Sequence, residues 1–109
     1  MSQSEFNFTV PDPKVFTTIQ ARFEEFHRLN PFVYDRLVKL AREMRAKGMR
    51  KMGIGMLWEV LRWQYYQQTT DANSRWAMND HYRSRYARRI EQQEADLKSI
   101  FELRKLTAD

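Results

Sequence analysis

Residues 54–68 read IGMLWEVLRWQYYQQ, and this stretch decides the fold. Its apolar side chains recur on nearly every side of a helix, so only a narrow arc at Gly55, Glu59 and Arg62 is polar. A helix that is apolar nearly all round belongs at the centre of a fold. We therefore predict an all-α domain that packs around a helix over residues 54–68.

Two further helices are predicted before this central one. Asp12-Pro13 and Asn30-Pro31 each place an N-cap residue before a proline at the first helical position. The first helix is expected over residues 13–28. The second is expected from Asn30-Pro31 to Gly48, because glycine is typical of the residue that follows a helix end. Their core stripes are expected at Val15, Phe16, Ile19, Phe23 and Phe26, and at Val33, Leu37, Leu40, Ala41 and Met44.

One or two helices are predicted after the central one. Residues 69–74 are turn-forming, and residues 75–78 fit either a short strand or a tethered loop, so a small β-hairpin or wing is expected near residues 70–79. Asn79 or Asp80 would cap a helix that runs to about residue 94. Residues 96–106 either continue that helix or form a separate short one. The predicted core face of the helix that begins at Asn79 or Asp80, with its continuation, comprises Tyr82, Tyr86, Ile90 and Leu97.

The length of 109 residues fits one domain with a substantial core. We expect an extended N-terminal arm over residues 1–12, a single helical domain over residues 13–106 and a tail over residues 107–109. Four or five helices would give a helix-turn-helix or winged-helix-like arrangement. The turn of about eleven residues between its last two long helices is longer than the three or four of the standard motif.

The positive charge is concentrated in the middle of the chain. The formal net charge is +5, yet residues 45–89 alone hold ten Lys or Arg against three acidic residues. Residues 1–44 are balanced, and residues 90–109 carry −2. A localised basic excess indicates a polyanionic partner, most often nucleic acid.

The sequence predicts a non-catalytic protein that binds double-stranded DNA, with a basic helix over about residues 80–94 lying in a groove. One arc of that helix would carry its groove-facing side chains, and Asn79 and the first-turn amides would suit a phosphate. The predicted groove residues are His81, Arg85, Arg88, Arg89 and Gln92. The predicted phosphate-binding residues are Arg45, Lys47, Arg50, Lys51 and Arg75.

Other interpretations of these features remain open. The arginine-rich arc could be a solvated face that binds nothing. The aromatic residues of the central helix could stack on single-stranded bases, although core packing is the commoner role. The same arginines could instead dock on an acidic host protein, with the Phe6/Phe8 arm adding a strand to that partner. A homodimer is compatible with DNA binding, since short domains often span two half-sites.

Several classes of chemistry are not indicated. The chain has no cysteine and only two histidines, His27 and His81, so neither a metal site nor a nucleophile–base pair is predicted. His27 lies at the edge of an apolar stripe and is expected to pack or cap. Gly48 and Gly53 lack the following Lys-Ser/Thr of a phosphate loop. We expect no cofactor, no enzymatic activity, no membrane association and a cytoplasmic location.

Three segments, FHRLNP over residues 26–31, MLWEVLRW over residues 56–63 and YRSRYAR over residues 82–88, resemble segments of small uncharacterised proteins encoded by bacteriophages and prophages. The resemblance covers most of residues 25–104. It implies a bacterial or phage setting, with either DNA transactions or interference with a host protein. It assigns no catalytic residue to this chain.

Overall fold

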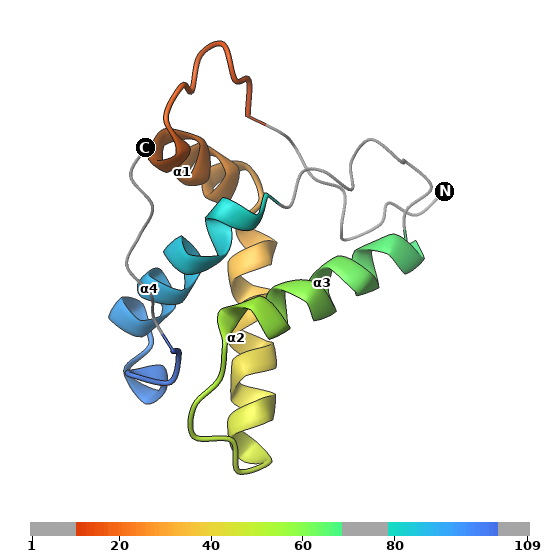
Figure 1. Cartoon of the computed structure of the whole chain (residues 1–109), viewed down its shortest axis with the longest axis vertical. Coiled ribbons are helices and arrows are strands. Elements are labelled where there is room, and N and C mark those ends of the chain that lie inside the picture. Colours follow the sequence, from red (N-terminus) through yellow and green to blue (C-terminus); the bar gives the residue numbers. More distant parts are fainter. Residues whose placement is uncertain (1–10, 69–78, 103–109) are drawn as a thin grey trace.

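The computed structural model describes residues 11–68 and 79–102, and within these residues the chain is helical with no strand (Figure 1). The predicted all-α class is therefore confirmed. The wing expected near residues 70–79 falls almost wholly outside the described residues, as do Arg75 and the Phe6/Phe8 arm. The elements are α1 (Ile19–Leu29), α2 (Pro31–Ala46), α3 (Ile54–Gln68), η2 (Asp80–Tyr82), α4 (Arg83–Gln93) and η3 (Ala95–Leu97).

The first helix begins six residues later than predicted. Asp12 instead closes a turn, because its side chain accepts a hydrogen bond from the Lys14 amide at 2.9 Å and its carbonyl accepts from the Val15 and Phe16 amides. The helix starts only after Thr18, whose hydroxyl accepts from the Ala21 amide at 3.0 Å. A β-branched N-cap with a satisfied side chain thus sets the start of α1, and Val15 is left exposed.

Asn30 separates α1 from α2. Its backbone N–H and its side-chain Nδ2 both donate to the Phe26 carbonyl at 2.9 Å, so the side chain closes α1 rather than capping α2. Pro31 then provides the first residue of α2, as expected, since its missing N–H would have no partner there. Asn30 is buried, and these bonds satisfy it inside the core.

The predicted end of α2 at Gly48 is confirmed. Gly48 has a φ of 99°, its N–H donates to the Arg45 carbonyl, and the Met49 N–H reaches back to the Met44 carbonyl. This pair of bonds is the Schellman motif, which closes a helix with a left-handed residue. The turn redirects the chain from α2 into the segment that leads to α3.

Replacing Gly48 with alanine should lower the free energy of unfolding by about 1 kcal/mol, because a Cβ is strained in the left-handed region. Nothing lies within 4 Å of a Cβ added at Gly48, so the loss would reflect backbone conformation alone. Urea denaturation followed by circular dichroism measures it. Gly53→Ser is the matched control, since Gly53 has open space and no positive φ. Equal losses in both variants would contradict this explanation.

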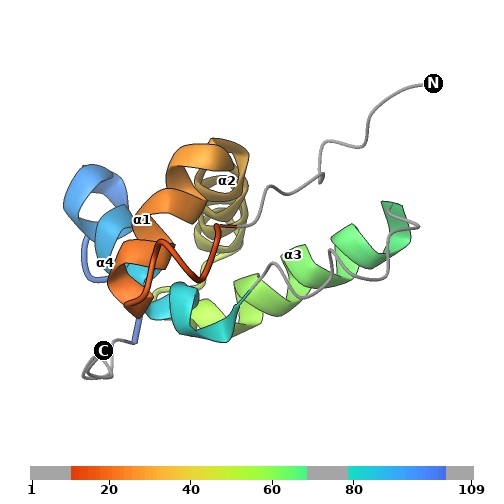
Figure 2. The same cartoon turned by 90° about the horizontal axis from the view of Figure 1, so that it is seen from above.

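The bounds predicted for α3 are confirmed, but only one side of it lies in the core. Leu57, Trp58, Leu61 and Tyr65 are fully buried, and α3 packs against α2 and α4. The opposite side exposes Met56, Val60 and Trp63. Seen from above, the C-terminal half of α3 extends beyond the body formed by the other three helices (Figure 2). The near-continuous apolar surface of α3 therefore has a core side and an exposed side.

A helix was expected over residues 96–106. Residues 96–102, the part of this segment that the structure describes, do not form it. A short 3₁₀ turn, η3, is followed by Ser99 with a φ of 63°, which a continuing helix excludes. Phe101 then forms an isolated parallel bridge with Met52. The predicted core positions Tyr82, Tyr86, Ile90 and Leu97 are all buried, which confirms the inward face of this region.

Candidate nucleic-acid interface

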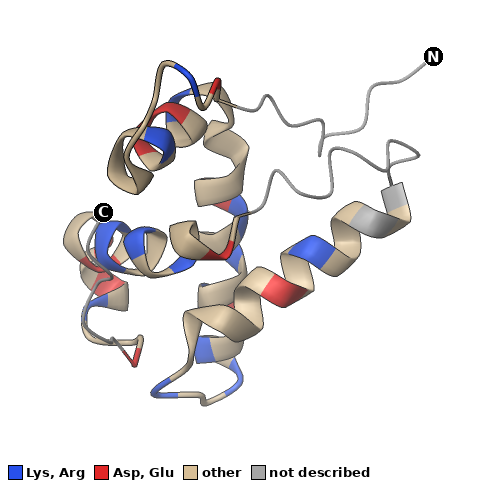
Figure 3. Ribbon diagram, turned by 45° about the horizontal axis from the view of Figure 1, so that its top comes forward, with Lys and Arg blue, Asp and Glu red and all other residues tan. Residues whose placement is uncertain are grey.

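Five exposed cations gather where α2 ends and the chain turns toward α3. Four are close in sequence, and the fifth comes from the turn after η3. Figure 3 shows Lys and Arg at the end of α2 and along the segment that follows it. Arg45 lies in the last turn of α2 and Lys47 at its C-cap, where cations complement the helix dipole. We call this set the basic corner: Arg45, Lys47, Arg50, Lys51 and Lys98.

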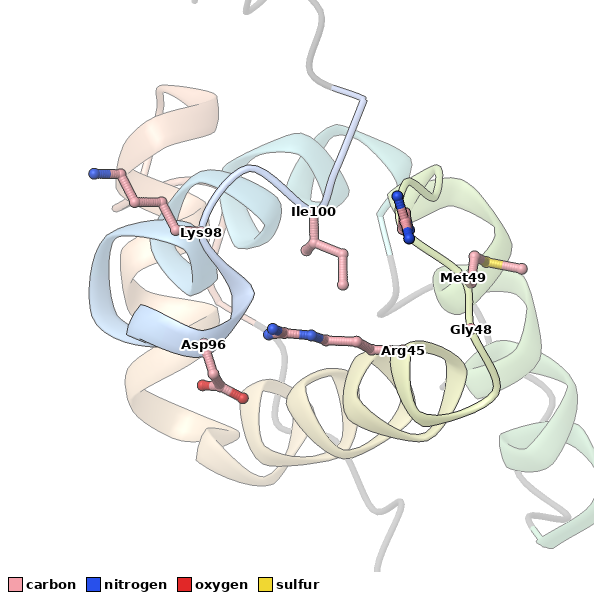
Figure 4. Close-up of a pocket in the computed structure, with 7 residues that line it drawn as sticks. Arg45, Gly48, Met49, Asp96, Lys98 and Ile100 are labelled. Carbon is pink, nitrogen blue, oxygen red and sulfur yellow. The ribbon is translucent and has the colours of Figure 1, made fainter.

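A cavity of about 390 Å³ opens within the basic corner. Its walls carry Arg45, Arg50 and Lys98, and Met49 and Ile100 add apolar surface. The Ile100 side chain points into the cavity, and the Arg45 guanidinium extends across it toward Asp96 (Figure 4). A concave site with apolar walls and a few charged groups is typical of a ligand-binding pocket.

The wall of this cavity also carries one acidic residue, Asp96, whose carboxylate is already engaged. Asp96 accepts two hydrogen bonds from Arg42, each of 2.9 Å, and Arg42 also bonds Glu94. Those bonds hold the pKa of Asp96 below its ordinary value, and the charge of Arg45 adds to the shift. No ion pair joins Arg45, Lys47 or Arg50 to a carboxylate of the described residues. The basic corner thus retains a positive field.

The backbone of the basic corner is fixed by bonds to the C-terminal segment. The Met52 N–H donates to the Ile100 carbonyl and the Glu102 N–H donates to the Met52 carbonyl, both at 2.9 Å. The Lys51 ammonium donates to the Ser99 carbonyl at 2.7 Å. These contacts hold Lys98 beside residues more than forty positions earlier in the chain. A cluster whose backbone is already fixed loses less conformational entropy when it binds a ligand.

The prediction that α4 presents an arc of exposed cations is wrong. Arg85 is only 7 % exposed, and its guanidinium donates to the Gln20 side chain at 2.8 Å and to the His81 carbonyl at 3.1 Å. Arg89 forms an ion pair with Glu24 and lies over the Phe23 ring, 5.1 Å from its centroid. Both arginines therefore bind α4 to α1. The helical periodicity of one segment cannot reveal partners on another helix.

The other predicted residues near α4 are dispersed. Asn79 accepts from the His81 amide at 2.9 Å and caps the short η2 that leads into α4, rather than α4 itself. His81 and Gln92 are exposed, and Arg88 is half-buried. Arg75 lies outside the described residues. The structure thus brings together Arg45, Lys47, Arg50 and Lys51 but leaves no continuous cationic arc on α4.

His27 packs as expected, against aromatic rings. Its ring lies 5.6 Å from the centroids of both Tyr34 and Tyr86 and stacks on Phe23. Burial lowers the pKa of His27 from its ordinary value of 6.5, and the nearby Arg89 charge lowers it further. Within the described ranges, no group of three His, Asp or Glu is placed to hold a metal ion.

The shifted pKa of His27 predicts a pH-dependent stability. The folded state binds this proton less well than the unfolded state, so the free energy of unfolding should fall as the pH drops below about 6.5 toward the lowered pKa. Urea midpoints measured between pH 7.5 and 5.5 test this, with His27→Phe expected to flatten the dependence. An imidazole NMR titration at or above 6.5 for His27 would contradict the prediction.

Comparison with protein-family models, with curated proteins and with solved structures found no match to this chain. Among the described helices, none combines the length and the apolar character that crossing a membrane requires.

Proposed function

We propose that this chain is a non-catalytic nucleic-acid-binding protein that holds the phosphate backbone of duplex DNA at the basic corner. The observation that carries the proposal is the cluster itself: Arg45, Lys47 and Arg50 are exposed, close together and not joined to carboxylates of the described residues. Lys51 follows directly in the sequence, and Lys98 lines the same cavity as Arg45 and Arg50.

Phosphate is the anion that this arrangement suits best. Arginine can bond two phosphate oxygens at once, and lysine supplies a compact charge, so a mixed cluster fits a backbone with successive phosphates. Such contacts orient the protein on the duplex without reading its sequence. Base reading by α4 has little support, because Arg85 and Arg89 are engaged by Gln20 and Glu24.

Fluorescence anisotropy of labelled random duplex DNA, titrated with the protein at several salt concentrations, tests the proposal. We expect binding whose logarithmic affinity falls linearly with the logarithm of salt, with a slope of about −3 to −5 if three to five cations neutralise phosphates. Parallel titrations with a matched DNA single strand and a matched RNA duplex compare the affinities for these classes of nucleic acid. Absence of DNA binding at low salt would contradict the proposal.

A second candidate is an adaptor or inhibitor of phage type that docks on an acidic protein. The feature that favours it is the apolar lining of the cavity, where Met49 and Ile100 lie beside cations. An acidic peptide with one apolar side chain would use both, whereas a phosphate backbone uses only the charge.

A competition experiment separates the two functions. A fluorescent acidic peptide containing one leucine is displaced with either duplex DNA or an all-glutamate peptide of equal charge. Preference for the leucine peptide over both competitors would favour the acidic protein. Preference for duplex DNA would favour the nucleic acid.

A further inference from the structure

The cavity within the basic corner is larger than a phosphate group requires. Its volume of about 390 Å³ lies within the range of about 300–1,000 Å³ that is typical of small-molecule pockets. A bare phosphate would fill only a small part of this space. A ligand that fills the cavity therefore carries an organic group as well as its charge.

The charge of the cavity wall matches one phosphate monoester. The charged residues that line it are Arg45, Arg50, Lys98 and Asp96, and their formal charges leave +2. The Asp96 carboxylate is engaged, because both of its oxygens accept hydrogen bonds from Arg42. A phosphate monoester carries about −1.5 to −2 near pH 7, whereas each internal phosphate of a DNA strand carries one negative charge. The wall is therefore better matched to a terminal phosphate than to an internal one.

The side chains of the cavity separate a charged part from an apolar part. The Arg45 guanidinium extends across the cavity, the Ile100 side chain points into it, and the Lys98 ammonium extends away from Ile100 (Figure 4). Guanidinium groups can bond two phosphate oxygens at once, so Arg45 and Arg50 are the groups suited to hold the phosphate. Ile100 is only 4 % exposed and forms an apolar floor on which a sugar or a base can pack.

We propose that this cavity binds the phosphate monoester of a single nucleotide, with the phosphate at Arg45 and Arg50 and the sugar or base against Ile100. The inference rests on the proposed function, since the same cations hold phosphate, but it names a different ligand group. Internal phosphates lie on the convex surface of a duplex and continue into the strand on both sides, so they cannot fill a concave site. A free nucleotide and the end of a DNA strand both carry the required group.

Isothermal titration calorimetry at one low salt concentration compares adenosine 5′-monophosphate with three analogues. Inorganic phosphate lacks the organic group, adenosine lacks the charge, and the 3′,5′-cyclic monophosphate keeps the sugar and base but carries one negative charge. We expect the monophosphate to bind at least about tenfold more tightly than each analogue, because only it engages both the cations and the apolar floor. A monophosphate that binds no more tightly than inorganic phosphate or the cyclic ester would overturn the proposal.

Two further measurements locate the bound nucleotide. Arg45→Gln should weaken binding of the monophosphate at least about tenfold, since charge-assisted hydrogen bonds are lost. Lys39→Gln is the matched control, because Lys39 is exposed on the same helix and does not line this cavity. The Ile100 methyl groups should show nuclear Overhauser effects to nucleotide protons, and those of the fully buried Ile90 should not. Equal loss in both variants, or no effect at Ile100, would overturn the proposed site.

Duplexes that differ only in their ends identify the source of the nucleotide. A duplex with 5′-phosphate ends should bind more tightly than one with 5′-hydroxyl ends if the ligand is a strand end, and equally if the ligand is a free nucleotide. Duplex binding without a preference for the monophosphate over inorganic phosphate would overturn this inference alone. Binding of the monophosphate without any duplex binding would support this inference and contradict the proposed function.

Discussion

Trp58→Ala should lower the free energy of unfolding by about 3–5 kcal/mol, the cost of removing a large aromatic side chain from a packed core. Trp58 is fully buried in the centre of α3, and its ring lies 5.9 Å from that of Tyr86 on α4. Losing it opens a cavity between the two helices. Because small domains are stable by only about 5–15 kcal/mol, this variant should be partly unfolded at moderate temperature.

Trp63→Ala is the matched control for this prediction. It removes the same side chain from the same helix, but Trp63 lies on the exposed side. Its effect should stay within about 0.5 kcal/mol. Urea denaturation of both variants makes the comparison. Equal destabilisation would contradict the division of α3 into a core side and an exposed side.

Removing Arg45, Lys47 and Arg50 together by alanine substitution should weaken binding to random duplex DNA by about 100-fold or more at low salt, since phosphate contacts supply most non-specific affinity. The slope of logarithmic affinity against logarithmic salt should fall in magnitude by about 3, because each contact contributes about 0.9. All three side chains are exposed, so the fold should tolerate the change. Anisotropy titrations at matched salt provide the measurement.

The control for the triple variant removes the same charge from other surfaces. Lys14, Arg28 and Lys39 are exposed and lie outside the basic corner. Their replacement by alanine should change affinity only through the net charge, by a few-fold at low salt. If both triple variants lost affinity equally, binding would depend on overall charge and not on the basic corner.

The helices of this fold could largely be predicted from local signals. Pro31 and Gly48 mark the two ends of α2, and hydrophobic periodicity defines α3. Asp12-Pro13 was misleading, because its proline fits a turn as well as a first helical residue and Thr18 offers a better cap. The left-handed φ of Ser99 was not foreseen, since no local signal marks it and the residues that follow it pair with Met52, far away in the sequence.

The candidate site was predictable only where its residues are close in sequence. The four cations between Arg45 and Lys51 formed a visible cluster, and the structure keeps them together. Arg85 and Arg89 could not be placed correctly, because their partners Gln20 and Glu24 lie 65 residues earlier. Lys98 was missed because it lies in a net acidic segment, and contacts of Lys51 and Met52 with residues 99–102 bring it to the basic corner.

The most direct test of the proposed function is to map the DNA contact surface by NMR. Titrating ¹⁵N-labelled protein with a short random duplex should shift the amide resonances of residues 45–51 and 98–100 first, and those shifts should disappear at high salt. The account predicts little change at His81 of η2 or at Arg88 and Gln92 of α4. Shifts confined to those three residues, or no shifts at low salt, would contradict binding at the basic corner.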